Sequence, residues 1–133
     1  MKALAASVSR GIPLGAVISA ADNSGARLLK VFTVMGAKTV KGRVAGAGVS
    51  DLVMASVIKG EPGMRKQVVL AVIVRQKKSF RRFTGERITF EDNAAVVLKD
   101  DKGNPKGTIF KGPIAKEVAT RWPAIGKVAK MVL

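Results

Sequence analysis

A chain of 133 residues suits one domain of ordinary size, and its 47% of hydrophobic residues is enough to form a buried core. It carries 24 lysines and arginines against 9 acids, a net charge of +15, and it has no histidine, cysteine or tyrosine. This composition excludes wholesale disorder, disulfides, thiolate metal sites and histidine-based catalysis.

The N-terminal residues 1–11 contain only a weak apolar stretch, interrupted by Ser7, Ser9 and Arg10. This pattern predicts a flexible lead-in rather than a signal peptide. The longest apolar run, residues 68–74, is far shorter than the roughly 20 residues that a membrane-spanning helix needs. We therefore expect a cytoplasmic protein without a membrane partner.

Residues 12–111 have the pattern of a mainly-β domain. Short apolar or alternating segments are separated by clusters of turn-forming residues. The segment QVVLAVIV is the most apolar and predicts a central strand buried on both faces. Five or six short strands at this spacing indicate a small barrel or sandwich. The expected strands are 15–20, 27–35, 51–60, 67–74, 86–90 and 93–99.

The last part of the chain, residues 112–133, predicts a helical tail. Pro113 suits the first turn of a helix, the apolar residues after it recur with helical spacing, and Pro123 stops this helix after Trp122. A second short helix is expected after Pro123. Because the chain has no internal repeat and no long linker, all of it is expected to form a single domain.

The stretch RQKKSFRRF at residues 75–83 directly follows the most apolar strand. It lies between two expected strands, which predicts a long, protruding basic hairpin. A net charge of +15 repels itself in the folded state and predicts a polyanionic partner, with nucleic acid first and an anionic membrane surface second. Arginine also offers a planar fork of donors that matches phosphate oxygens. The cations of this stretch and the next strand are Arg75, Lys77, Lys78, Arg81, Arg82 and Arg87.

Two phenylalanines, Phe80 and Phe83, flank the arginine pair. Aromatic rings beside cations stack on unpaired bases in many RNA-binding proteins. The alternative is a solvated hairpin tip whose phenylalanines fold back on the barrel as anchors. The sequence leaves both interpretations open.

Further cations are candidates for the same interface. The glycine-rich segment 36–48 suits a loop or hairpin whose backbone approaches phosphates closely, although it has no nucleotide-binding glycine spacing. A second group surrounds the turn GEPG at 60–63. These candidates are Arg27, Lys38, Lys41, Arg43, Lys59, Arg65 and Lys66.

The sequence offers no catalytic or metal-binding constellation. Its few acids sit mostly in turns, and the segments EDN and DDKGN lack the spacing of a calcium loop. We therefore expect no enzyme activity, no cofactor and no metal. Trp122 has two interpretations, packing of the helical tail on the barrel or, with Arg121, an anchor for a protein partner.

Several separated motifs occur in a characteristic order: ADNSGA (21–26), AVIVRQKK followed by RR and a glycine (71–85), ITFEDNAAVVL (88–98), PKGT (105–108) and GPIAKEV (112–118). Together they resemble the universal large-subunit ribosomal protein L fourteen family, in its archaeal or eukaryotic form. The resemblance covers nearly everything from residue 12 onward. One position departs from the family pattern: Thr84 stands where the family favours Asp, Asn or Ser, and Phe83 precedes it where Pro is frequent.

The resemblance implies a closed five-stranded antiparallel β-barrel with a C-terminal helical tail. It also implies a structural, rRNA-binding protein of the large subunit that lies near the subunit interface. The neighbours it implies are ribosomal proteins L three and L twenty-four e, small-subunit rRNA at intersubunit bridges, and the anti-association initiation factor six.

The alternative function is a free-standing RNA-binding β-barrel of the RNA-chaperone type. Such modules carry several exposed aromatic residues on their strands. This chain has only 5% aromatic residues, and none of them cluster at strand spacing. The composition therefore favours the ribosomal interpretation. The sequence does not say which rRNA helices are contacted or which cations face them.

Overall fold

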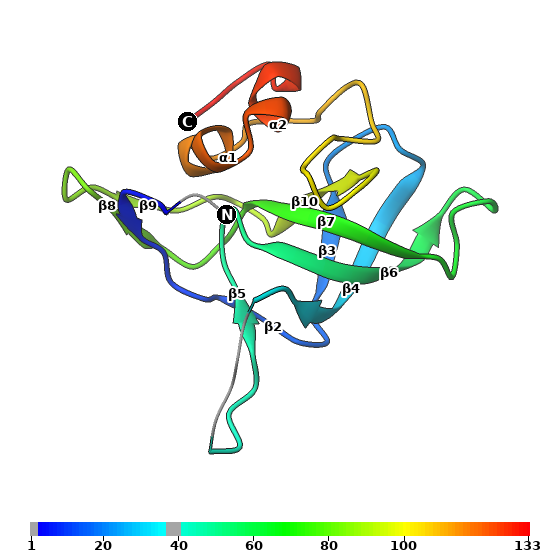
Figure 1. The fold of residues 1–133 in the computed structure, drawn as a ribbon, viewed down its shortest axis with the longest axis horizontal. Helices are drawn as coiled ribbons and strands as arrows, with labels where there is room; N and C mark the ends of the chain where they lie inside the picture. The colour runs from blue at the N-terminus through cyan, green and yellow to red at the C-terminus, as the bar shows by residue number, and fades with distance from the viewer. Residues whose placement is uncertain (1–2, 37–40) are drawn as a thin grey trace.

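The computed structural model describes residues 3–36 and 41–133, and Figure 1 shows a β-barrel with two short helices on one side and two projections. Lys38, one of the predicted RNA contacts, lies outside the described residues. The strands in chain order are β1 (Ala6–Ser7), β2 (Ile12–Pro13), β3 (Val17–Ala20), β4 (Ala26–Val34), β5 (Gly46–Ala47), β6 (Leu52–Gly60), β7 (Val68–Arg75), β8 (Phe80–Arg82), β9 (Arg87–Ile88) and β10 (Ala94–Leu98). The helices are α1 (Lys116–Arg121) and α2 (Pro123–Val128).

Five strands close into a barrel in the order β10-β3-β4-β6-β7, which confirms the expected architecture. The expectation that all of its pairs are antiparallel is wrong at one place, because β10 and β3 are parallel and pair Ala94 with Ser19 and Ala95 with Ala20. The reason is topological. Strand direction cannot alternate all the way around a closed ring with an odd number of strands, so at least one neighbouring pair must be parallel.

Strand β7 shows why the barrel has two hydrophobic layers. Successive side chains of a strand point to opposite faces. Ala71 and Ile73 therefore pack inside the barrel, while Val72 and Val74 pack on its outer side under the helices. The prediction that the whole strand is buried holds only from Ala71 onward, because Val68 is exposed and Val69 and Leu70 pack only partly against the two layers.

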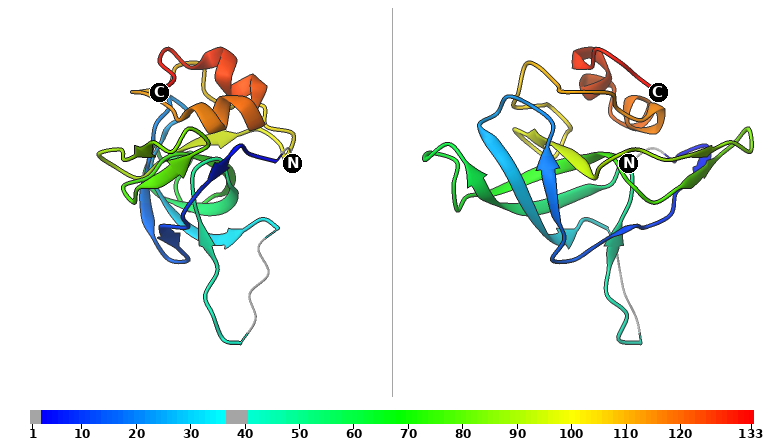
Figure 2. Two further views of the ribbon diagram at one scale, coloured as in Figure 1. Left: turned by 90° about the vertical axis from the view of Figure 1, so that its left-hand side faces the viewer. Right: turned by 180° about the vertical axis from the view of Figure 1, so that it is seen from behind.

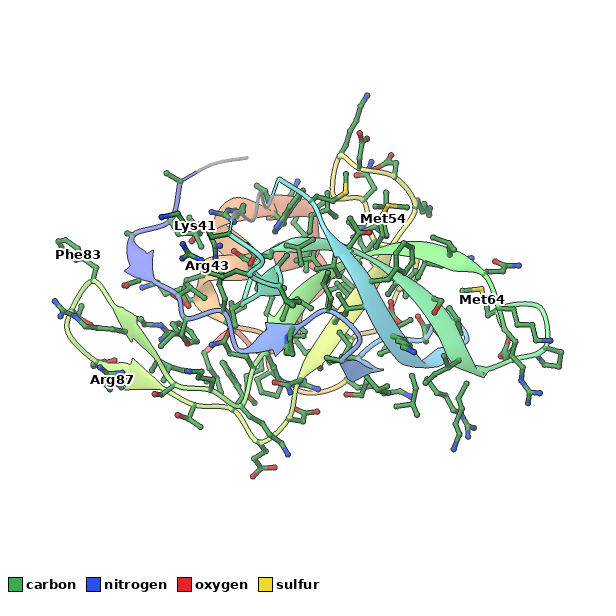
Figure 3. The ribbon with its side chains drawn as sticks, turned by 90° about the horizontal axis from the view of Figure 1, so that it is seen from below. Lys41, Arg43, Met54, Met64, Phe83 and Arg87 are labelled. Carbon is green, nitrogen blue, oxygen red and sulfur yellow. The ribbon has the colours of Figure 1, made fainter. Side chains whose placement is uncertain are left out.

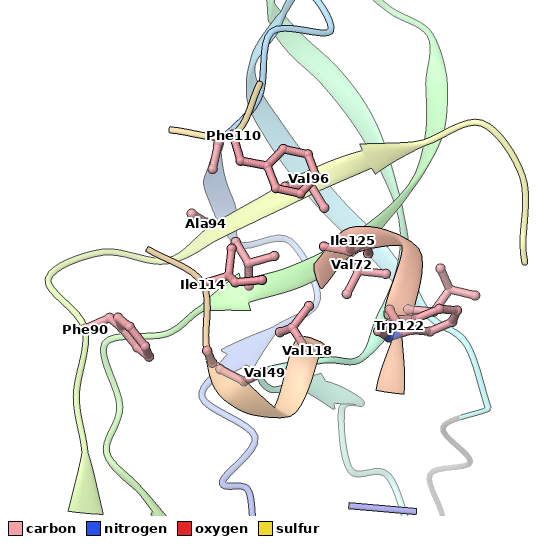
Figure 4. Close-up of a cluster of buried hydrophobic side chains, with 14 of the residues drawn as sticks. Val49, Val72, Phe90, Ala94, Val96, Phe110, Ile114, Val118, Trp122 and Ile125 are labelled. Atoms are coloured by element: carbon pink, nitrogen blue, oxygen red, sulfur yellow. The ribbon is translucent and has the colours of Figure 1, made fainter. Parts of the chain in front are cut away.

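The outer layer joins the helical tail to the barrel. Val118, Trp122 and Ile125 from the tail pack against Val72 and Val96 of the barrel (Figure 4). All five of these side chains are buried. At about 1.5–3 kcal/mol for each buried side chain of this kind, the layer is a substantial part of the stability and fixes the tail in place.

The helices differ in detail from the prediction. Pro113 precedes α1 instead of beginning it, and Pro123 is the first residue of α2 rather than only a stop. A proline suits that position because its missing N–H would have no partner in the first helical turn. The second helix ends at Val128, and Val132 then forms a bridge with Ile114. Neither helix in the described chain has the apolar length to cross a membrane.

Two projections leave the barrel at different places (Figures 1 and 2). The first, which we call the arm, is the connection between β7 and β10 and contains the β8–β9 hairpin. The second, which we call the glycine-rich loop, is the described stretch 41–45 that leads into β5, and the pairing of β5 with β2 forms its stem. The N-terminal segment is not a free lead-in, because β1 pairs with β8 and extends the sheet of the arm.

Candidate nucleic-acid interface

Most of the cations predicted to contact RNA are exposed, and they occupy three places on the molecule. The arm and the β6–β7 turn lie at opposite ends of the barrel, and the glycine-rich loop projects between them (Figure 1). The exposed cations are Lys77, Lys78, Arg81 and Arg87 on the arm, Lys41 and Arg43 on the loop, and Arg27, Lys59, Arg65 and Lys66 around the β6–β7 turn.

The pairing of the arm's strands decides which of its cations reach solvent. Ser7, Arg81 and Arg87 are directly opposite one another across β1, β8 and β9, so they share one face. All three are exposed. Like charges directly opposite each other are destabilising, so the pair Arg81 and Arg87 favours a bound anion.

Arg82 lies on the other face of the arm, against the helical tail. Its guanidinium binds Glu117 of α1, with Nε 3.1 Å from Oε2, and it also donates to the carbonyl of Leu133. Both side chains of the ion pair are largely buried, with exposed fractions of 15% and 8%. This arginine therefore ties the arm to α1, and its predicted contact with RNA stays a prediction.

Arg75 stands at the root of the arm and is also internal. Its Nε lies 2.8 Å from Oδ1 of Asp92, and its Nη1 donates to the carbonyls of Lys111 and Pro113. The residue is only 8% exposed. A buried guanidinium needs such partners, because an unpaired buried charge is strongly destabilising. Arg75 thus fixes the start of the tail to the barrel, and its predicted role in binding RNA stays a prediction.

The two phenylalanines of the arm also differ in burial. Phe80 is 1% exposed in the core and lies under Arg82, whose Cζ is 5.8 Å from the centre of the ring. Phe83 at the tip is 85% exposed (Figure 3). The anchoring interpretation therefore describes Phe80. Only Phe83 is placed where a ring can stack on a base.

The structure favours the core interpretation of Trp122. Its ring is buried, and Nε1 donates to the carbonyl of Ser50 at 2.9 Å. Arg121 beside it lies 3.6 Å from a carboxylate oxygen of Asp51. Together these contacts hold the loop before β6 against the junction of the two helices.

Gln76 is a functional residue that sequence reasoning missed. It is completely buried at the root of the arm, where its Oε1 accepts a hydrogen bond from the N–H of Val49 at 2.8 Å. Its Nε2 lies 3.2 Å from the carbonyl of Ser9 and 2.8 Å from that of Lys78. The Ser9 hydroxyl in turn donates to the carbonyl of Ser79. One side chain thus connects the arm, the N-terminal segment and the end of the glycine-rich loop.

The two other basic groups have simpler surroundings. Around the β6–β7 turn, Arg27, Lys59 and Arg65 line one shallow pocket. The turn is held by backbone bonds, such as that from Lys66 N to the carbonyl of Val57 at 2.9 Å. Lys41 and Arg43 extend from the glycine-rich loop, and both are visible from below the barrel (Figure 3). A polyanion that contacts all three groups must therefore surround the barrel or be folded itself.

Comparison with known proteins gives one consistent result. The family model described as "Ribosomal protein L14p/L23e" matches residues 11–133. The large ribosomal subunit protein uL14 of Nanoarchaeum equitans is 53% identical over 133 residues, which cover all of both chains. The proteins of the same name from Halobacterium salinarum and Halorubrum lacusprofundi are 49% and 50% identical, again over the full length of both chains.

Proposed function

The chain belongs to the ribosomal protein L14p/L23e family, and from this membership we propose that it is a structural constituent of the large ribosomal subunit that binds large-subunit rRNA. The family is non-enzymatic, so its members contribute to translation through assembly and contact. As part of the ribosome, the protein acts in the cytoplasm.

The observation that carries the RNA proposal is the exposed cationic face of the arm. Arg81 and Arg87 stand directly opposite each other with no acid across from either, an arrangement that a phosphate stabilises. The exposed cations of the loop and of the β6–β7 turn extend this charge around the barrel. Phosphate contacts of this kind position a protein on RNA without reading its sequence.

The finer placement of the protein follows the family resemblance. We propose a location near the subunit interface, with contacts to small-subunit rRNA at bridges. Its protein neighbours would be ribosomal proteins L three and L twenty-four e, and the anti-association initiation factor six would dock on it. The exposed Phe83 and the outer edge of the arm are the surfaces available for such neighbours.

Salt dependence tests the proposal directly. Neutralising about six phosphates predicts that log affinity for large-subunit rRNA falls against log salt with a slope of roughly −4 to −5. A filter-binding titration with the purified chain measures this slope. Binding that does not depend on salt would contradict a phosphate-dominated interface.

Assembly separates the ribosomal function from that of a free RNA chaperone. A structural constituent remains with the large subunit when ribosomes are sedimented through a high-salt cushion, since many contacts hold it. A free chaperone is washed off under the same conditions. Loss of the chain into the supernatant, while other large-subunit proteins remain bound, would favour the chaperone.

A further inference from the structure

We propose that the N-terminal segment 7–11 is itself part of the RNA interface, and that it joins the arm and the glycine-rich loop into one continuous surface for a single stretch of RNA backbone. Arg10 is the cation at the junction. This inference rests on the proposed function, since it concerns how the chain binds RNA. It reassigns a segment that the sequence indicated to be a flexible lead-in.

Backbone pairing fixes both ends of this segment. At one end Ser7 is opposite Arg81 on the arm, and at the other Ile12 is opposite Ala47 in the stem of the loop. The segment therefore runs from one basic projection to the other, along the underside of the barrel (Figures 1 and 3). This segment thus connects the cations of the arm with those of the glycine-rich loop, which are far apart in the sequence.

Close approaches between the three segments bring the residues that carry these cations near one another. A side chain at Gly11 would bring its Cβ to 2.7 Å from the Cβ of Lys78, and one at Gly46 would bring its Cβ to 3.3 Å from the Cβ of Arg10. Arg10 thus stands between Lys78 of the arm and the stem that leads to Arg43. All three cations are exposed, and none of them forms an ion pair with an acid of the described residues.

Gln76 holds this surface in a fixed shape. Its buried amide binds the carbonyl and the hydroxyl of Ser9 on one side and the N–H of Val49 on the other. A site whose groups are already ordered loses less conformational freedom when it binds. The N-terminal segment is therefore presented as a rigid strip rather than as a tail that must fold on RNA.

The chemistry of the strip fits an RNA backbone better than a protein. Arg10 and Ser7 are exposed donors, and none of the large exposed hydrophobic side chains of the described chain lies within residues 7–11. Guanidinium and hydroxyl groups are the donors that commonly contact phosphate oxygens and sugars. A protein partner would need an apolar centre, which this strip does not offer.

Replacing Arg10 tests its role as a phosphate contact. We expect R10A to weaken binding to large-subunit rRNA by about tenfold and to make the salt slope shallower by about 1. R10K should recover most of the slope, because it keeps the charge. The matched control is K99A, which removes an equally exposed cation after the end of β10 that is remote from Arg75 and the arm. If R10A behaves like K99A, the inference is wrong.

A proximity experiment tests whether the surface is continuous. The chain has no cysteine, so Ser7→Cys and Val44→Cys each create a single attachment point for an iron chelate. Val44 is 68% exposed beside Arg43, and its replacement removes no charge. Hydroxyl radicals from the two positions should cleave one and the same stretch of rRNA. Cleavage in two separate rRNA regions would overturn the single-stretch inference.

These outcomes are distinguishable from failure of the proposed function. If the unmodified chain shows no salt-dependent binding to rRNA, the proposed function itself fails. If the unmodified chain binds with the expected slope while R10A matches K99A, or the two cleavage sites differ, only the inference about the N-terminal segment fails.

Discussion

The arm and the β6–β7 turn are both basic hairpins at opposite ends of the barrel, but they are held in different ways. The arm is fixed by buried side chains: Phe80 in the core, Gln76 at the root and Arg82 bound to Glu117. The β6–β7 turn is fixed by backbone bonds, such as that from Glu61 N to the carbonyl of Gly25, by the buried Met64, and by a bond from Arg65 Nε to the carbonyl of Gly60. The long projection therefore buries some of its own cations in ion pairs, whereas the cations of the short turn stay exposed, including Arg65, whose side chain donates to the carbonyl of Gly60.

This difference changes how a basic sequence should be interpreted. In the arm, Arg75 and Arg82 are neutralised by carboxylates of the same chain. Around the β6–β7 turn, Arg27, Lys59 and Lys66 are exposed. The number of cations in a stretch is thus an upper limit on the number of phosphates that it contacts.

The sharpest test of the difference compares the two phenylalanines of the arm. Phe80→Ala removes a completely buried ring and should lower the free energy of unfolding by about 3–4 kcal/mol. Phe83→Ala removes an 85% exposed ring and should change it by less than about 0.5 kcal/mol. Urea titration followed by tryptophan fluorescence measures both. Equal effects would mean that the arm is not anchored by the core.

The next largest loss of stability is expected when the ion pair between the arm and α1 is removed. Glu117→Ala leaves the guanidinium of Arg82 largely buried without its carboxylate and should cost about 2 kcal/mol. Glu61→Ala is the matched control, because it removes an exposed acid from the β6–β7 turn, and it should cost less than about 0.5 kcal/mol. Hydrogen exchange should also speed up in β8 for the first variant only. Unchanged exchange there would show that the ion pair does not hold the arm.

Stability and binding should change in opposite directions on the exposed face of the arm. Replacing Arg81 and Arg87 together by alanine removes two like charges directly opposite each other, so stability should rise by a few tenths of a kcal/mol. The same change should weaken rRNA binding at least tenfold and make the salt slope shallower by about 2. Thermal unfolding and filter binding on the same samples provide the two readouts.

A second pair of exposed cations, on the β6–β7 turn, allows the contributions of the two ends of the barrel to rRNA binding to be compared. Arg65 and Lys66 replaced by alanine should also weaken binding. Because the two ends lie far apart, the free-energy losses of the two pairs should add within about 0.5 kcal/mol when all four residues are replaced. A strong departure from additivity would mean that the two ends do not contact RNA independently.

The smallest changes in stability and in rRNA binding are expected when Lys66 alone is replaced. Its φ of 64° lies in the left-handed region, which favours glycine. Lys66→Gly should leave stability unchanged or raise it by up to about 1 kcal/mol, while rRNA binding falls by a fewfold. Lys66→Asn is the control, since it also tolerates this φ without the charge. A loss of stability in the glycine variant would contradict the view that lysine is kept there for its charge.

The long barrel strands could be predicted because alternation and burial are local signals. The expected segments 27–35, 51–60 and 93–99 differ from β4, β6 and β10 by at most one residue at each end. The two-residue strands β1 and β2 could not be found in this way, because two residues show no periodicity. Their partners on the arm and in the loop are set by the tertiary fold.

The cations show the corresponding limit for the site. Nothing in the local sequence distinguishes Arg81 from its neighbour Arg82. Only the alternation of β8 places them on opposite faces, and the carboxylate that binds Arg82 comes 35 residues later. The buried position of Gln76 could not be predicted either, because a glutamine between two cations has no characteristic pattern. A periodicity argument applied to RRF would have suggested that only one of the two arginines faces outward.

The parallel pairing of β3 with β10 has a consequence for synthesis of the chain. It joins Ser19 to Ala94, so the barrel cannot close until most of the chain has left the ribosome that makes it. Until then β3 is an open sheet edge, the kind of edge that pairs with other chains. Contacts so distant in sequence also slow folding. The nascent protein therefore passes through a period in which rapid capture by a chaperone would protect it from aggregation.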